Sequence, residues 1–314
     1  MAGIYLHIPF CKRRCIYCDF YSTTMEQRKD EYIEALCREL EMRRDYTGEP
    51  SVATVYFGGG TPSQLEERHF HRVFETIGNN YRLRPDAEIT LEANPDDLTP
   101  DYVAMLRRLP FNRISIGIQT FNDETLRLLH RRHTASQAVE AVRRCQEAGF
   151  GNISIDLMYG LPGESRDNWA DDLQQAIGLQ VQHISAYHLI YEEGTELWEL
   201  RRRHRVEEVD EDSSLTFFSM LIDRLRDAGF EHYEISNFAL PGMHSRHNSS
   251  YWDGTRYLGC GAAAHSYNGE SRQWNVASLD RYIKDIQAGK LPCEVETLDL
   301  HTRYNDRIIT AIRT

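Results

Sequence analysis

The sequence predicts an α/β protein in which a partial (β/α)6 barrel of the TIM type is followed by an α+β extension. From residue 3 to about residue 190, short β-rich runs alternate with longer helical patterns, which is typical of parallel strands joined by crossover helices. Glycines and unusual polar residues follow the ends of several runs, and the functional residues of a barrel gather at the carboxyl ends of its strands. This placement favours a barrel over an open sheet, which the alternation alone also allows.

The elements of the repeat follow from these patterns in turn. Strands are predicted at Gly3–Pro9, Ala53–Gly59, Glu88–Asn94, Arg113–Gln119, Asn152–Tyr159 and His183–Ile190. Helices with Leu, Val or Ala at three- and four-residue spacings are predicted at Arg28–Tyr46, Gln64–Gly78, Thr99–Arg108, Ser136–Ala148 and Asp167–Gly178. We therefore assign the barrel core to residues 1–195.

A different pattern begins beyond residue 195. A charged helical stretch, Asp210–Ala228, precedes a segment rich in Gly, His, Tyr and Asn, Glu231–Asn268. A helix near Leu279–Ala288 and an amphipathic stretch, Asp299–Thr314, come last. Residues 196–314 are therefore predicted to form the extension. Because the final stretch stops without a helix cap, we expect that a further C-terminal domain has been removed.

Charge and hydropathy exclude several classes of function. The 36 Lys and Arg residues against 48 Asp and Glu residues give a net charge of −12, which is unfavourable for nucleic-acid binding. No segment approaches the roughly 20 apolar residues that cross a bilayer, so we expect no transmembrane segment, although peripheral membrane contact is not excluded. No signal peptide precedes the first cysteines, which predicts a cytoplasmic protein.

Three of the seven cysteines crowd into eight residues near the N-terminus. The spacing Cys11-x3-Cys15-x2-Cys18 places three thiolates on one compact loop, which suits an iron–sulfur cluster. A structural zinc site or an electron-transfer ferredoxin would usually need four ligands. Three cysteines therefore predict a [4Fe–4S] cluster with one iron open to another ligand.

The surroundings of these cysteines resemble the radical S-adenosylmethionine (SAM) superfamily. The run HIPFC that leads into Cys11 is similar to the opening of that superfamily, and its flanks resemble the oxygen-independent coproporphyrinogen III oxidase family. The resemblance extends from Gly3 to at least Tyr267. It implies that Cys11, Cys15 and Cys18 hold the cluster. It also implies that the reduced cluster passes an electron to SAM, giving methionine and a 5′-deoxyadenosyl radical.

Segments similar to those of the family supply the residues expected to bind SAM. The run GGGTP follows the second strand, where glycines let a ligand approach the backbone closely, although a tight turn would use the same residues. Arginine suits a carboxylate, and aspartate suits a ribose diol. Packing inside the barrel would also explain its tyrosines and its glutamate. The resemblance assigns SAM binding to Gly59, Gly60, Thr61, Glu92, Gln119, Arg131 and Asp156, with Tyr5 and Tyr17 near the adenine and the cluster.

Two departures from the oxidase pattern point to a different branch. Phe20 stands where the oxidase has an additional cysteine, and Cys11 lies almost at the start, where the oxidase has a long N-terminal extension. Residues 247–252, HNSSYW, instead match the HNxxYW pattern of the HemW branch, whose members are heme chaperones. The resemblance therefore implies a heme carrier.

The HNxxYW residues have a chemistry that suits heme. A neutral imidazole is a good axial ligand, and Tyr251 and Trp252 offer flat apolar surface to the macrocycle. His247 is therefore assigned as the heme ligand, with His244 and His265 as alternatives. A histidine beside aromatic rings can also be purely structural.

These observations predict a heme chaperone that carries a [4Fe–4S] cluster and SAM and delivers heme to acceptors such as respiratory enzymes. The alternative is an enzyme, an oxygen-independent coproporphyrinogen III oxidase that abstracts hydrogen from a propionate side chain. A simple iron–sulfur electron carrier is disfavoured, because it needs neither an open iron nor the GGGTP run.

Overall fold

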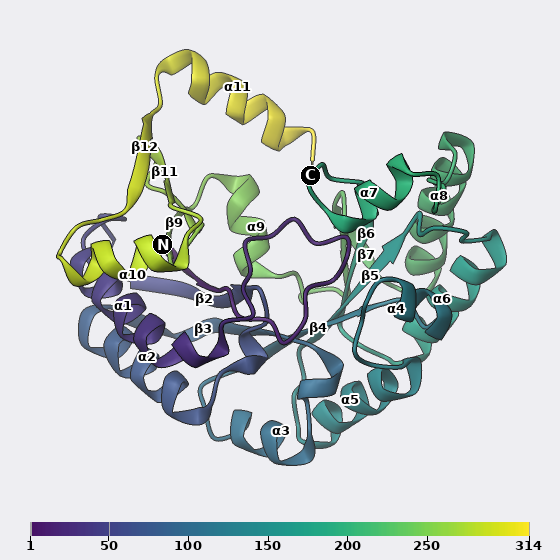
Figure 1. The fold of residues 1–314 in the computed structure, drawn as a ribbon, viewed down its shortest axis with the longest axis horizontal. Coiled ribbons are helices and arrows are strands. Elements are labelled where there is room, and N and C mark those ends of the chain that lie inside the picture. Colours follow the sequence, from purple (N-terminus) through teal and green to yellow (C-terminus); the bar gives the residue numbers. More distant parts are fainter. Residues whose placement is uncertain (1, 50, 314) are drawn as a thin grey trace.

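The chain folds around one curved sheet in a computed structural model that describes residues 2–49 and 51–313. Its strands lie in the order β12-β11-β10-β9-β1-β2-β3-β4-β5-β6-β8-β7. Strands β1 to β6 are parallel and stand side by side in chain order (Figure 1). A doubly wound sheet would reverse its strand order at a switch point. The predicted partial barrel is confirmed, and it stays open because β12 and β7 form the two free ends of the sheet.

Most of the barrel strands begin and end close to their predicted positions. They are β1 (Ala2–Ile8), β2 (Ser51–Gly59), β3 (Arg82–Ala93), β4 (Arg113–Gln119), β5 (Ile153–Tyr159) and β6 (His183–His188). The exception is β3, which begins at Arg82 because residues 82–83 pair with the start of β2 before a shift in register.

Helices cover the outer face of these strands (Figure 1). The predicted helices are α1 (Lys29–Met42), α2 (Glu67–Asn80), α3 (Pro100–Leu106), α5 (Ala135–Glu147) and α6 (Arg166–Gly178). Three short helices were not predicted, namely α4 (Asp123–Leu128), α7 (Glu196–Arg202) and α9 (Arg246–Asp253), nor were three 3-10 turns at Glu26–Arg28, Pro62–Gln64 and Pro95–Asp97. Thr134 and Ser165 form capping boxes that fix the starts of α5 and α6.

The predicted α+β extension continues the same sheet. It contains α8 (Glu211–Asp227), β7 (Glu231–Glu234), β8 (Asn237–Ala239), α9 (Arg246–Asp253), β9 (Arg256–Cys260), β10 (His265–Tyr267), β11 (Ser271–Asn275), α10 (Leu279–Gln287), β12 (Cys293–Thr297) and α11 (Leu300–Ala311). Because β9 pairs in parallel with β1, the sheet passes from one segment into the other without a break. The boundary at residue 195 stays a prediction.

The barrel strands carry aliphatic side chains on their outer face and mostly polar ones on their inner face. On β4, Ile114, Ile116 and Ile118 are fully buried, and Arg113 and Ser115 alternate with them. The inner face, here called the lumen, carries Tyr5, His7, Thr54, Tyr56, Glu88, Thr90, Glu92, Arg113, Ser115, Ser154, Asp156, His183, Ser185 and Tyr187. Parallel strands covered on both faces are usually apolar throughout, so this lumen is built for polar contacts.

Helix α11 spans the open side of the barrel, from the end of β12 to a point near β7 (Figure 1). Its C-terminal end is fixed there by a hydrogen bond from the Ile235 amide to the Arg313 carbonyl, at 3.0 Å. None of the helices in residues 2–49 and 51–313 has both the length and the apolar character needed to cross a membrane.

Candidate functional site

The three clustered cysteines lie on the loop that leaves the carboxyl end of β1. Thr61 Oγ1 donates to Cys11 Sγ at 3.3 Å, and Arg131 Nη1 donates to Cys15 Sγ at 3.6 Å. Burial raises the pKa of the Cys11 thiol and raises that of Cys18 to about 11. Thiolates at these positions therefore need positive charge or hydrogen-bond donors close to the sulfur atoms, and a metal cluster supplies such charge.

A chain of side chains joins two of these cysteines across the top of the barrel. Arg131 donates from Nη2 to Asn94 Oδ1 at 2.9 Å, and Asn94 Nδ2 donates to Thr61 Oγ1 at 3.4 Å. Because Thr61 and Arg131 also contact Cys11 and Cys15, the chain ties the cysteine loop to the ends of β2, β3 and α4. From the sequence, Asn94 was predicted only to end a strand, and the structure shows that it bridges Thr61 and Arg131.

Gly59 ends β2 and Gly60 follows it, and the surrounding atoms leave no room for a side chain at either position. A Cβ on Gly60 would lie 2.7 Å from the Pro9 carbonyl carbon, and one on Gly59, where φ is +106°, would lie 2.5 Å from the His7 ring. The Gly60 amide donates to the Ile8 carbonyl at 2.9 Å. These glycines thus pack GGGTP against the strand that leads into the cysteines, and their contact with SAM stays a prediction.

Gln119 ends β4 with a backbone φ of +73°, which is unusual for a residue with a side chain. Its amide nitrogen folds back over Gly117, where a Cβ would lie 2.9 Å from it and 3.4 Å from Arg131 Nη2. The side chains of Gln119 and Arg131 therefore lie next to each other above Gly117, at the mouth of the lumen. Backbone strain of this kind is common where a side chain is held for function.

Two carboxyl groups face the lumen below this point. Glu92 accepts from the Tyr56 hydroxyl at 2.7 Å and from the Gly59 amide at 3.1 Å, and burial raises its pKa to about 7. Asp156 accepts from Ser115 Oγ at 3.2 Å, and burial raises its pKa as well. Strongly shifted carboxyl groups on the inner face of a barrel are typical of a ligand site.

The two predicted tyrosines lie at different depths. Tyr17 is in the cysteine loop, where burial raises the pKa of its hydroxyl, Arg131 lowers it, and Cys15 and Cys18 raise it further. Tyr5 lies deeper in the lumen, where it donates to or accepts from His7 Nδ1 at 3.2 Å and stacks on Tyr56. Only Tyr17 therefore borders the cysteines.

His247 lies near the start of β1, at the end of the barrel opposite the cysteine loop. It is 1% exposed, with Nδ1 2.8 Å from Thr54 Oγ1 and Nε2 3.0 Å from the Tyr251 hydroxyl. Glu88 fixes the start of α9 by accepting from the amides of Arg246 and His247, both at 3.0 Å. Burial lowers the pKa of His247 to about 3, and Arg113 adds to this effect, so the imidazole is neutral.

The alternative histidines are more accessible. The His244 side chain is 40% exposed, with Nε2 2.7 Å from a Glu231 carboxylate oxygen, and its ring stacks on Tyr233. His265 is exposed on β10 beside Trp274. By geometry, both rings are easier to reach than that of His247.

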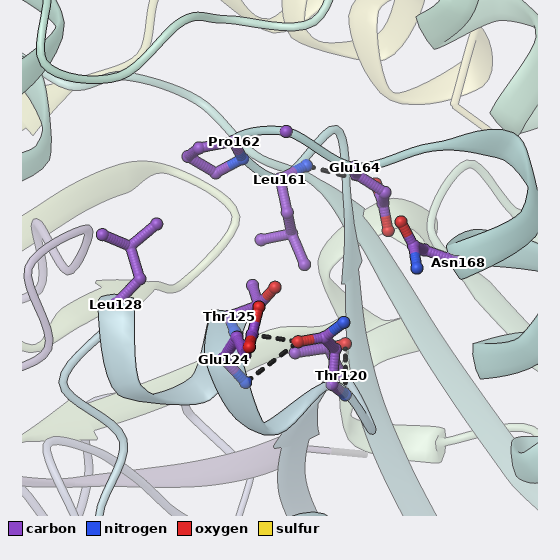
Figure 2. Close-up of a pocket in the computed structure, with 10 residues that line it drawn as sticks. Thr120, Glu124, Thr125, Leu128, Leu161, Pro162, Glu164 and Asn168 are labelled. Atoms are coloured by element: carbon purple, nitrogen blue, oxygen red, sulfur yellow. Dashed lines mark hydrogen bonds between the residues drawn. The ribbon is translucent and has the colours of Figure 1, made fainter.

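A cavity of about 380 Å³ opens outside the lumen, between α4 and the loop that follows β5 (Figure 2). Figure 2 shows Leu161 pointing from that loop toward α4. Glu164 accepts from the Gly160 amide at 2.7 Å, and burial raises its pKa to about 8. The cavity lies next to Gln119 through Thr120, but no residue assigned to SAM lines it.

The cysteine loop suits an iron–sulfur cluster better than a single metal ion. Within residues 2–49 and 51–313, no three His, Cys, Asp or Glu side chains gather closely enough to hold one ion. A [4Fe–4S] cluster places its irons at separate corners, so its thiolates are spread apart. A buried Cys11 and half-buried Cys15 and Cys18, with hydrogen-bond donors at Cys11 and Cys15, fit such a cluster.

Comparison with known proteins identifies the family. Residues 5–176 match the sequence profile of the Radical SAM superfamily. The chain is 36% identical to a Mycobacterium tuberculosis protein named heme chaperone HemW, over 99% of this chain and 81% of the relative. The relatives of that name from Bacillus subtilis and Lactococcus lactis are 37% and 39% identical, over 92% and 98% of this chain and 77% and 80% of their own lengths. The chain belongs to the HemW family.

Solved structures agree with this placement at the level of the fold. Coproporphyrinogen III oxidase (HemN) from Escherichia coli superimposes with a TM-score of 0.86 at 24% identity, over 99% of this chain and 75% of that one. At this identity the likeness shows the fold alone. Membership of the HemW family within the radical SAM superfamily implies SAM and a [4Fe–4S] cluster as cofactors.

Proposed function

We propose that this chain is a cytoplasmic heme chaperone that binds heme and delivers it to acceptors such as respiratory enzymes. The observation that carries the proposal is the 36–39% identity to proteins named heme chaperone HemW over nearly the whole chain. The lumen and the HNxxYW helix α9 supply polar and aromatic groups that suit the two kinds of ligand. Residues 1–195 would hold the cluster and SAM, and residues 196–314 would hold heme.

At the top of the barrel, Cys11, Cys15 and Cys18 would hold a cluster that supplies one-electron chemistry when bound. Arg131 and Thr61 stabilise negative charge on the sulfur atoms through their hydrogen bonds. Glu92 and Asp156 are acceptors for the amino and hydroxyl groups of SAM. Gln119 and Gly59 to Thr61 border the same space.

His247 is the proposed heme ligand, and its contacts set a condition on that role. Its Nε2 can reach an iron only after leaving the Tyr251 hydroxyl. A hemin titration of the reconstituted protein, followed by visible absorption, tests this: His247→Ala should abolish or change the saturable spectrum, and Tyr251→Phe should strengthen binding. If His244→Ala or His265→Ala removes the spectrum instead, the ligand is the exposed histidine. Absence of specific heme binding in the wild type would contradict the proposal.

The oxidase alternative has a weaker basis in this chain. Its structural likeness shows the fold alone, and Phe20, which stands where that family has a cysteine, is 63% exposed on the cysteine loop. Incubation with coproporphyrinogen III, SAM and a reductant distinguishes the two functions, since only an oxidase releases carbon dioxide from the propionates.

A further inference from the structure

One buried cation in the lumen has nitrogens that are not paired. Arg113, at the start of β4, is 1% exposed, and its Nε and Nη1 have no hydrogen-bond partner within residues 2–49 and 51–313. Arg43, the other deeply buried arginine of the barrel wall, donates to Glu39, Gly259, Ser266 and Gln273. A buried charge without compensation is strongly unfavourable, so the charge of Arg113 must be balanced from nearby.

The register of the sheet places Arg113 beside the two lumen carboxyl groups. Arg113 pairs with Thr90 on β3, whose buried Oγ1 also lacks a partner, and Glu92 is the next lumen residue along that strand. Ser115, the next lumen residue on β4, contacts Asp156 at 3.2 Å. Arg113 therefore lies one lumen position deeper than Glu92, which pairs with Ser115, and two positions deeper than Asp156, which pairs with Gly117.

The electrostatic surroundings agree with this placement. Burial raises the pKa of Asp156 and of Glu92, and Arg113 opposes that shift in both cases. The other titratable groups around these carboxyl groups and Arg113 are tyrosines and histidines of the surrounding elements: Tyr5 on β1, Tyr56 on β2, His183 and Tyr187 on β6, Tyr233 on β7, and His247 and Tyr251 on α9. The charged side chain of Arg131 lies above them, and that of Glu88 lies below on β3. Glu88 is already engaged by the start of α9.

The charges in this space then sum to a simple balance. Ionised Glu92 and Asp156 contribute two negative charges, and Arg113 contributes one positive charge. SAM brings a sulfonium, an ammonium and a carboxylate, which together give one positive charge. Arg131 is engaged by Cys15 and Asn94, and Glu88 by the first amides of α9, so these two charges are compensated separately. The charges of Glu92, Asp156, Arg113 and SAM then sum to zero, and without Arg113 a negative charge that burial disfavours would remain.

We propose that Arg113 is the buried counter-charge that keeps Glu92 and Asp156 ionised for SAM, acting as a positioning residue without touching SAM. This inference rests on the proposed binding of SAM by these carboxylates. It deepens that proposal by naming the group that sets their charge.

The test is SAM binding by isothermal titration calorimetry between pH 5.5 and 9, on anaerobically reconstituted protein. Wild-type affinity should fall as the pH drops below about 7, where Glu92 takes up a proton. Arg113→Met should move this midpoint up by about one pH unit, which is roughly a fivefold loss of affinity at pH 7, and affinity should recover at pH 9. Arg113→Lys should restore most of the wild-type profile.

Thr90→Val is the matched control, because it removes the neighbouring unpartnered hydroxyl and leaves the charge unchanged. Its pH profile should equal that of the wild type. Circular dichroism and the visible absorption of the cluster report whether each variant folds and is loaded. If Arg113→Met does not fold, the Glu92→Gln/Arg113→Met double variant should, because it removes one buried negative charge together with the cation.

An Arg113→Met protein with an unshifted profile would overturn the inference, as would a uniform loss of affinity at every pH. Failure of the double variant to fold would also overturn it, since Arg113 would then act through packing. A wild-type protein that binds no SAM at any pH would instead contradict the proposed SAM site itself.

Discussion

Two buried polar clusters in this molecule differ in how completely their charges are paired. Beside β9 and α10, Glu39 accepts from Tyr282, Asn275, Gly261 and Arg43, at distances of 2.7 to 3.1 Å. In the lumen, Arg113 has two buried nitrogens without partners among the residues that the structure describes, and Arg131 has one. In the first cluster the charged groups are paired, while Asn275 Oδ1, a neutral acceptor, has no partner among the described residues. A cluster whose charges are paired fixes a fold, whereas a cluster whose cations keep unused donors has capacity left for a ligand. The difference separates the structural polar groups of this chain from the groups that we propose to bind SAM.

The largest effect is expected from breaking the satisfied cluster. Glu39→Ala leaves Arg43 buried without its carboxylate and should lower the free energy of unfolding by about 3–5 kcal/mol. Urea unfolding measures this, and SAM affinity of the folded fraction should not change. Glu41→Ala, an exposed neighbour on the same helix, is the control. A loss of unfolding free energy below about 1 kcal/mol would show that the Glu39 cluster does not stabilise the fold.

Neutralising a lumen carboxyl should have the opposite effect on stability. The folded-state pKa of Glu92 is about 7, above the ordinary value of 4.5, so its ionisation costs stability as the pH rises through that interval. Glu92→Gln should therefore stabilise the protein by roughly 2–3 kcal/mol at pH 8 and by almost nothing at pH 4.5, while SAM binding is lost. Urea unfolding at the two pH values, with calorimetry for SAM, measures both. Destabilisation of Glu92→Gln at pH 8 would show that Glu92 stabilises the fold, as Glu39 does.

Breaking the series of hydrogen-bonded side chains that links Cys11 to Cys15 should weaken SAM binding without removing the cluster. Asn94→Ala deletes the acceptor of Arg131 Nη2, a charge-assisted hydrogen bond, and should cost about 1.5 kcal/mol, or roughly tenfold in SAM affinity. Iron content and the cluster absorption should stay at wild-type levels. Loss of the cluster together with SAM would mean that Asn94 supports the loop rather than the ligand.

The smallest effect is expected from Ser115→Ala. Removing the hydroxyl that contacts Asp156 leaves that carboxylate with fewer donors, so its pKa should rise further and SAM affinity should fall about threefold at pH 7. The loss should be larger at pH 5.5 than at pH 9, because the carboxyl group of the variant takes up its proton at a higher pH than that of the wild type. Calorimetry at the two pH values measures it, and an equal loss at both would contradict an effect through charge.

The sequence predicted the barrel well because its strands and helices have clear periodic patterns. Ile114, Ile116 and Ile118 alternate with polar residues, and that alternation specifies β4 to the residue. Arg113 was predicted only as the first residue of this strand, and its missing hydrogen-bond partners depend on contacts between strands that cannot be read from one strand. The bridging role of Asn94 likewise needs α4 and β2 in place.

The extension was predicted less well, for physical reasons. The strands β8 and β10 have three residues each, which is too few to show an alternating pattern. Strand β9 is stabilised by pairing with β1, which lies about 250 residues earlier in the sequence. The HNxxYW motif indicated a histidine beside aromatic rings, but not that Thr54 and Tyr251 would occupy both of its ring nitrogens. Burial of this kind arises only when α9 meets β2.

The most direct test of the account is electron paramagnetic resonance of the dithionite-reduced, reconstituted protein with and without SAM. We predict a [4Fe–4S] signal whose g values shift when SAM is added, because one iron has no protein ligand, and no signal when Cys11, Cys15 and Cys18 are all replaced by alanine. A signal that SAM leaves unchanged, or a cluster that survives in the triple variant, would contradict the central claim.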